Sequence, residues 1–173
     1  MRDLTTEDDK YQRVLEALSA VRDGDFTVQL PVHWDGMQGK IASCYNEIIA
    51  NNRHLASELA RVGEKVGREG QTRKRIAGPN RTGCWLDMQQ SVNNLIDDLV
   101  RPVETMTEAI AGVAKGDLTR TVPLEADGRP LQGEFLRSAT IVNTMIEQLG
   151  VFTSEVTRVA REVGTDGKLG GQA

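Results

Sequence analysis

The sequence is poor in aromatic residues, prolines and cysteines. Its 173 residues include only two tryptophans, two tyrosines and three phenylalanines. Rings supply much of the buried area of a broad globular core, so this composition favours helices packed along narrow seams instead. The two cysteines, Cys44 and Cys84, are too few for a disulfide framework or a zinc site. Two histidines, with no H-x-x-x-H or C-x-x-C pattern, give no reason to expect a metal or another cofactor.

Long apolar runs are also missing. No stretch approaches the roughly 18–20 apolar residues that cross a bilayer, and the polar residues 1–10 do not resemble a secretion signal. We therefore expect a cytoplasmic chain that does not insert into membranes. The net charge is −4, and a basic cluster near residues 68–81 lacks interleaved aromatics, which argues against nucleic-acid binding. That cluster is interpreted as an exposed connector and consists of Arg68, Arg73, Lys74, Arg75 and Arg81.

The chain contains an internal repeat, which is sought before other patterns because it governs the whole fold. Residues 19–32 match residues 111–124 at an offset of 92, and residues 46–70 match 143–167 at an offset of 97. The later copy thus carries five extra residues in its connector. The repeated unit is predicted to be a helix, an extended connector and a second helix. A divergent unit lies between the copies, with its connector at 71–84 and Asn93 in the place of Asn46 and Asn143.

Apolar residues in the second helices recur at steps of three and four. In one copy they include Ile41, Tyr45 and Ile48, and in the other Val142, Met145 and Leu149. This is the heptad pattern of a coiled coil, whose narrow stripe needs partner helices to be buried. Ordinary amphipathic helices on a globular core are the alternative, with a wider stripe. Asn52, at a seam position, is expected to fix register at some cost in stability.

The middle helix breaks this pattern around a proline. Two consecutive steps of four place a stutter between Leu99 and Val103, and Pro102 falls inside it. Proline removes a backbone donor and crowds the preceding turn. The sequence leaves two readings open: a joint within one helix, or the start of a new helix at Pro102.

The connectors of the two outer copies share one design. Each first helix is predicted to stop at a glycine, Gly24 or Gly116, in the left-handed conformation. Apolar residues at alternate positions then follow, and we expect them to pack into the groove between helices while prolines keep the backbone extended. About 10–14 extended residues reach back along four helical turns, so the two helices of a unit should be parallel. The connector residues concerned are Phe26, Val28, Leu30 and Pro31 in one copy, and Leu118, Val122, Pro123 and Leu124 in the other.

These features resemble HAMP domains, the signal-relay modules of histidine kinases, adenylate cyclases and chemoreceptors. The resemblance is carried by Pro102 and Glu104, residues 114–118, Gly133 and Glu134, and residues 143–145. In the first copy Gly24-Asp25-Phe26 and Tyr45-Asn46 match, but Met37 stands where the family has an acidic residue. The resemblance implies an all-α fold of tandem units, each a parallel four-helix coiled coil formed by a homodimer.

The tail from Val159 to Ala173 resembles the repeat junctions of soluble, osmosensing hybrid histidine kinases with many HAMP units. In that family ordinary and divergent units alternate, as they do here, and the chain is expected to be part of a longer protein. The predicted organisation is a polar segment 1–10, a first unit 11–57, a divergent unit 58–100, a third unit 101–152, and the first helix of a further unit at 153–173.

The predicted function is a relay in a two-component sensor histidine kinase, with a second copy of the chain and a downstream kinase core as partners. A relay in a chemoreceptor or cyclase and a passive coiled-coil spacer are the alternatives. No acid–base pair, nucleophile or metal cluster suggests catalysis within these residues. His54 lacks the neighbours of a phospho-acceptor and is interpreted as part of a solvated helix face. The predicted relay residues are Gly24, Phe26, Pro31, Ile41, Tyr45, Ile48, Asn52, Leu99, Pro102, Val103, Gly116, Leu118, Val122, Glu134, Val142, Met145 and Leu149.

Overall fold

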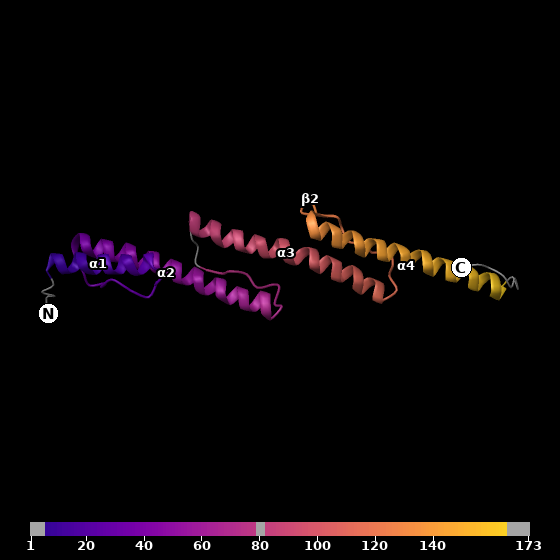
Figure 1. Ribbon diagram of the computed structural model, residues 1–173, viewed down its shortest axis with the longest axis horizontal. Coiled ribbons are helices and arrows are strands. Elements are labelled where there is room, and N and C mark those ends of the chain that lie inside the picture. The colour runs from indigo at the N-terminus through magenta and orange to yellow at the C-terminus, as the bar shows by residue number, and fades with distance from the viewer. Residues whose placement is uncertain (1–5, 79–81, 166–173) are drawn as a thin grey trace. The chain divides into compact units, whose positions relative to one another are not determined.

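The computed structural model describes residues 6–78 and 82–165, and this part of the chain is mostly helical, as the sequence predicts (Figure 1). Four α-helices follow one another: α1 (Glu7–Arg22), α2 (Gly36–Val62), α3 (Cys84–Ala114) and α4 (Gly133–Thr165). A π-helical segment, η1 (Gly63–Arg68), continues α2. Two short strands, β1 (Glu125–Ala126) and β2 (Arg129–Pro130), form an antiparallel hairpin. The chain divides into two compact parts, Met1–Ile96 and Asp97–Ala173.

Helix α1 has a defined signal at each end. The Thr6 hydroxyl accepts a hydrogen bond from the Asp9 N–H, and the Asp9 carboxylate accepts one from the Thr6 N–H, which forms a capping box. At the other end Gly24 has φ +87°. The Asp25 N–H donates to the Ala20 carbonyl at 2.8 Å, so the helix closes in a Schellman motif.

The helices α1 and α2 run in the same direction. Near their amino ends the Gln38 amide lies 3.4 Å from the Glu7 carboxylate, and further along both helices the Tyr45 hydroxyl reaches the Ala17 carbonyl at 2.8 Å. The connector returns along the pair, as Figure 1 shows. A core closes between the three segments, with Val14, Val21 and Phe26 packed against it; its buried members are Ala17, Leu30, Trp34, Ala42, Tyr45 and Ile49.

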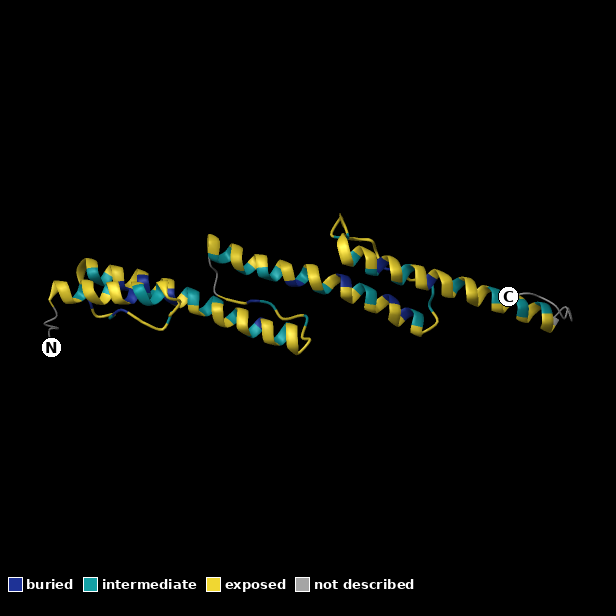
Figure 2. Ribbon diagram, viewed as in Figure 1, coloured by how far each residue is buried: buried dark blue, intermediate teal, exposed yellow. Residues whose placement is uncertain are grey.

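The second compact part repeats this arrangement with α3 and α4. Its core consists of Ala109, Val122, Ala139 and Ile146. Ala109 and Val122 correspond to Ala17 and Leu30 at the offset of 92 seen in the sequence. Ala139 and Ile146 correspond to Ala42 and Ile49 at the offset of 97. The two cores are therefore built from equivalent positions of the sequence repeat, and buried residues lie in narrow stripes with exposed residues outside them (Figure 2).

One more helix–connector–helix motif, the middle one of three along the chain, lies within the first compact part. The end of α2 with η1 supplies its first helix, a connector follows, and the beginning of α3 supplies its second. Val62, Ile76 and Ile96 are buried there. Ile96 lies three residues after Asn93, just as Ile49 follows Asn46 and Ile146 follows Asn143. Helix α2 thus serves two consecutive motifs, first beside α1 and then beside the second connector.

Three local features differ from the sequence expectation. Val28 and Leu124 do not pack with their neighbours: they are 36% and 46% exposed, and the packed connector residues are spaced by four, at Phe26 and Leu30 and at Leu118 and Val122. The cause for Leu124 is the hairpin, because its carbonyl accepts from the Leu131 N–H at 2.8 Å and closes the hairpin base. The hairpin itself and the π-helical turn were not expected.

Pro102 lies inside a continuous helix. Helix α3 runs from Cys84 to Ala114 with Pro102 in its interior, so no new helix starts there. The proline is buried, whereas the flanking seam residues Leu99 and Val103 are 49% and 52% exposed. Of the two interpretations left open by the sequence, the structure contradicts the start of a new helix at Pro102, and the joint within one helix stays a prediction.

Candidate functional site

An asparagine on the second helix holds the connector in each of the three motifs. Asn46 accepts from the Leu30 N–H at 2.9 Å and donates to the Leu30 carbonyl at 2.9 Å. Asn143 makes the same two bonds with Val122, at 2.7 and 2.9 Å. Asn93 makes them with Ile76, at 2.8 and 3.1 Å. We call these three contacts the asparagine clasps.

The clasps provide hydrogen-bond partners for buried peptide groups of the connector. An extended segment pressed against a helix cannot pair its peptide groups with a sheet, yet buried N–H and C=O groups need partners. A carboxamide offers one acceptor and one donor in a plane and so satisfies both groups of a single residue. The clasped residues Leu30, Ile76 and Val122 are 3%, 3% and 2% exposed. Each clasp therefore fixes the connector at the residue that fills the core.

A second fixed point lies where each outer connector begins. Gly116 has φ +83°, close to Gly24, and the Asp117 N–H donates to the Gly112 carbonyl at 3.0 Å. The Asp117 carboxylate accepts from the Thr119 hydroxyl at 2.7 Å and from its N–H at 3.1 Å. These hydrogen bonds lower the pKa of Asp117, and the equivalent bonds from Thr27 lower the pKa of Asp25. Both connectors leave their helices through the same turn.

Tyr45 adds a contact in the first motif only. Its buried hydroxyl lies 2.8 Å from the Ala17 carbonyl on α1 and 3.3 Å from the Val28 carbonyl on the connector. Burial, together with the charge of Asp25, raises the pKa of Tyr45. The equivalent residue in the third motif is Val142, which packs against the core without a polar group.

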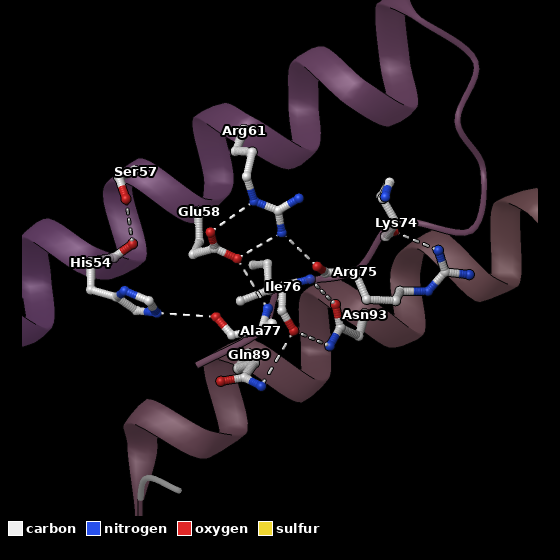
Figure 3. A network of polar contacts seen from close by, with 10 residues as sticks. All are labelled: His54, Ser57, Glu58, Arg61, Lys74, Arg75, Ile76, Ala77, Gln89 and Asn93. Atoms are coloured by element: carbon white, nitrogen blue, oxygen red, sulfur yellow. Dashed lines mark hydrogen bonds and ion pairs between the residues drawn. The ribbon is translucent and has the colours of Figure 1, made fainter. Parts of the chain in front are cut away.

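The middle motif has a polar network between α2 and its connector (Figure 3). The Arg61 guanidinium donates to both Glu58 carboxylate oxygens, at 2.8 and 2.7 Å. It also donates to the Arg75 carbonyl at 2.7 Å, while the Ala77 N–H donates to Glu58 at 3.0 Å. The pair therefore binds the backbone on either side of Ile76, whose own peptide groups are held by Asn93. We call this the Glu58–Arg61 clasp.

This network strongly favours the ionised form of Glu58. Hydrogen bonds from Arg61, the N–H of Ala77 and the nearby positive charges lower the pKa of Glu58 to about 2. The same pairing raises the pKa of Arg61. The Glu58 side chain is only 14% exposed, so its bonds form in a partly desolvated site where charged hydrogen bonds are stronger.

His54 belongs to this network, which corrects its interpretation as part of a solvated helix face. Its Nε2 lies 3.1 Å from the Ala77 carbonyl. A Cβ at Gly78 would come within 2.7 Å of the same nitrogen, so glycine there makes room for the ring. Gln89, which replaces the core alanine of the outer motifs, approaches the Ile76 carbonyl at 3.4 Å. Glu58 and Arg61 are identical in the two copies of the sequence repeat, but nothing in the pattern shows that they bind a connector.

The other predicted relay residues lie in several kinds of surroundings. Phe26, Leu118 and Val142 pack against the cores, while Asn52 donates to the Ile48 carbonyl of its own helix at 2.9 Å. Glu134 lies in the first turn of α4, 3.6 Å from Arg137. Pro31 is half-buried next to the clasped Leu30. The exposed group is the apolar seam: Ile41, Ile48, Leu99, Val103, Met145 and Leu149 are 37–52% exposed.

The described residues offer no metal centre, because no three His, Cys, Asp or Glu side chains gather there. Among the helices described, none is both long and apolar enough to span a bilayer. The contacts that recur are those between helix and connector, so the arrangement is suited to holding helices in a defined relative position.

Comparison with known families identifies part of the chain. Residues 80–150 match the model of the HAMP domain, over a range that includes all of α3, the connector between α3 and α4, and the first half of α4. This segment is a HAMP domain. A HAMP domain implies signal relay in a sensor protein, and the HAMP segment contains the complete third motif with the Asn143 clasp. No solved structure matches the chain.

Proposed function

We propose that the chain is the relay region of a two-component sensor histidine kinase, built from tandem HAMP units that work as a parallel homodimer. The observation that carries the proposal is the asparagine clasp, which occurs in the HAMP segment and again in the two motifs before it. Equivalent clasps, equivalent core residues and parallel helices support the extension of the HAMP identity from residues 80–150 to the first motifs.

The exposed apolar seam supports the homodimer. On α4 the residues Met145, Leu149, Phe152, Val156 and Val163 are 37–65% exposed and follow steps of three, four and seven. A stripe of this spacing is the a/d face of a coiled coil, and a single chain leaves it without a partner helix. A second copy in parallel would cover each helix pair with its equivalent and complete a four-helix bundle.

The end of α4 supports a further unit beyond the third. The Glu155–Arg158 pair, with contacts of 2.7 and 3.0 Å, repeats the Glu58–Arg61 pair at the offset of 97. Helix α4 would then serve two consecutive units, as α2 does. Each shared helix would carry a change in packing from one unit to the next.

The proposed mechanism is a shift between two packings of similar free energy. A signal at one end would favour one packing of the first unit, and the shared helices would bias the next unit. The asparagine clasps would keep each connector attached during the shift, because they bind the second helix and leave the first helix free to rotate against it. A change of a few kcal/mol in the free-energy difference between the two packings is sufficient for such a relay.

We also propose that the partners of the chain are a second copy and a kinase core in the same parent chain. We place the chain in the cytoplasm without membrane insertion or nucleic-acid binding. The chain itself carries no catalytic residues and needs no cofactor. A chemoreceptor or cyclase relay is the second candidate, favoured by the same HAMP match.

A fusion experiment tests the relay. Residues 1–173 are placed between a sensor and a histidine kinase core, and autophosphorylation is measured with and without stimulus. We expect Gly116→Val to abolish the response while the kinase core stays active. A response that survives this substitution unchanged, with disulfide mapping that shows the same helix proximities in both states, would identify a passive spacer.

A further inference from the structure

The connector of the third motif contains a closed hairpin that the first motif lacks. Asn46 lies 16 residues after its clasped residue, whereas Asn143 lies 21 residues after Val122. The five extra residues are accommodated by β1 and β2. Asp127 and Gly128, with φ of 51° and 72°, form the turn between them, which is the primed geometry of two-residue hairpins.

Two ion pairs join this hairpin to helix α3. The Asp127 carboxylate in the turn pairs with the Arg101 guanidinium. In the second pair the base is on the hairpin and the acid on the helix: Arg129 on β2 lies 3.4 Å from the Asp98 carboxylate. Helix and hairpin thus each contribute one acid and one base. A cleft of about 340 Å³ lies between them, lined on the helix side by Asp98, Arg101 and Pro102.

Both helix anchors lie in the turn of α3 that Pro102 weakens. Proline has no N–H, so the carbonyl four residues earlier, that of Asp98, loses its helical hydrogen bond, and the proline ring crowds the same carbonyl. Arg101 immediately precedes the proline. The hairpin is therefore attached to the turn of α3 that lacks one backbone hydrogen bond, because the proline at its end has no N–H to donate.

We propose that hairpin 125–130 is an ionic brace that holds turn 98–102 of α3, and that the turn opens when the brace is released. The inference goes beyond the proposed relay and stands without it, since it concerns the local opening of one helical turn. The hairpin base is closed by the hydrogen bond between Leu131 and Leu124, and Val122 is held by Asn143. Release of the hairpin from α3 therefore leaves the core of the second part intact.

The ion pairs of the brace are weak enough for salt or a competing charge to break them. The four side chains are 48–72% exposed, and exposed ion pairs stabilise weakly. Salt at about 1 M shortens the Debye length to about 3 Å and screens such pairs. A competing charged partner at the cleft would act in the same direction. The brace is thus a releasable contact, unlike the clasps, whose connector residues Leu30, Ile76 and Val122 are buried.

Hydrogen–deuterium exchange on the complete chain tests the proposal. Arg129→Glu places a negative charge beside Asp98, and we expect exchange in peptides covering 97–106 and 124–132 to rise about two- to fivefold, the range for an exposed pair. Asp98→Arg combined with Arg129→Asp reverses both charges and should restore slow exchange. Salt at about 1 M should act on the unmodified chain as Arg129→Glu does at low salt.

Arg137→Glu is the matched control, because Arg137 is 70% exposed and pairs with Glu134 at 3.6 Å within α4 and not with the hairpin or α3. It should leave both peptides unchanged. Faster exchange in 124–132 with none in 97–106 would overturn the brace, as would an equal effect of Arg137→Glu or the failure of the charge reversal. If Arg129→Glu does not fold, the salt series on the unmodified chain decides the question in the same way.

Discussion

The side-chain amide of Asn143 binds both the N–H and the carbonyl of Val122, at 2.7 and 2.9 Å. This single contact joins α4 to the connector at its most buried residue. The same relationship between Asn46 and Leu30 and between Asn93 and Ile76 means that one residue type, at one place in each motif, sets the position of the connector.

Replacement of Asn143 by Asp tests this clasp by removing the side-chain N–H that donates to the Val122 carbonyl. The new carboxylate can accept from the Val122 N–H but cannot donate to the Val122 carbonyl, which leaves that carbonyl unpaired and close to a negative charge. We expect a loss of about 2–3 kcal/mol in the free energy of unfolding at neutral pH, from urea titration. The protonated carboxyl can donate, so part of the loss should be recovered as the pH falls below about 5. A variant as stable as the parent at neutral pH would contradict the clasp.

The Glu58–Arg61 clasp predicts a dependence on pH with a definite sign. The pKa of Glu58 is lowered to about 2 in the folded chain, so its stabilisation is fully present above the unfolded value of about 4.5 and is lost as the pH falls towards 2. Glu58→Gln should reduce the free energy of unfolding by about 2 kcal/mol at pH 7, because a charged hydrogen-bond partner is removed. The difference between variant and parent should shrink below about pH 4.5.

Glu155→Gln is the matched control for that experiment. Glu155 makes the same pair with Arg158, but the two side chains are 43% and 45% exposed. An exposed pair contributes at most about 1 kcal/mol, so this variant should change the stability little at any pH. Equal effects of the two substitutions would show that the contacts of Glu58 with the connector add nothing.

Gly39 is predicted to be required at the start of α2. A Cβ there would lie 2.1 Å from the carbonyl oxygen of Trp34, a backbone atom that cannot move aside cheaply. Gly39→Ala should destabilise the first motif by about 2–4 kcal/mol, as for overpacked or strained core positions. Gly63→Ala is the control, because no atom lies within 4 Å of its Cβ position and its φ of −57° suits any residue. Thermal unfolding followed through tryptophan fluorescence compares the two.

Gly116 tests backbone conformation without steric contact. Its φ is +83°, yet nothing lies within 4 Å of an added Cβ. Gly116→Val should therefore cost about 1–3 kcal/mol from the strained backbone alone. Amide exchange of Asp117 and Val122 should increase because the helix stop holds the connector entrance. Unchanged exchange at both amides would show that the turn does not depend on glycine.

The sequence predicted the parts of this fold that follow from periodicity and repetition. The offsets of 92 and 97 anticipated which residues form equivalent cores, because a repeated unit must bury the same positions. Gly24 and Gly116 were recognised as helix stops because few other residues adopt their conformation. The parallel course of α1 and α2 followed from connector length.

Tertiary contacts between polar groups were not predictable in the same way. Glu58 and Arg61 have the i,i+3 spacing of an ordinary pair on one helix surface, and only the return of residues 75–77 along α2 turns them into a clasp. His54 was misinterpreted for the same reason. The hairpin carries an Asp-Gly turn signal at 127–128, but the flanking residues lack the alternating apolar pattern of strands. From the five extra residues the sequence therefore predicted only a longer connector.

The most direct test of the proposed parallel homodimer is a cysteine cross-linking scan along α4. Cys44 and Cys84 are exposed and are first replaced by serine, and single cysteines are then placed at successive positions from Leu149 to Val159. Parallel, in-register helices bring each seam residue near its own copy over several turns, so disulfide-linked dimers should peak at Leu149, Phe152, Val156 and Val159. Antiparallel helices bring a residue near its own copy only where they cross. Cross-linking confined to one position, or absent throughout the scan, would contradict the account.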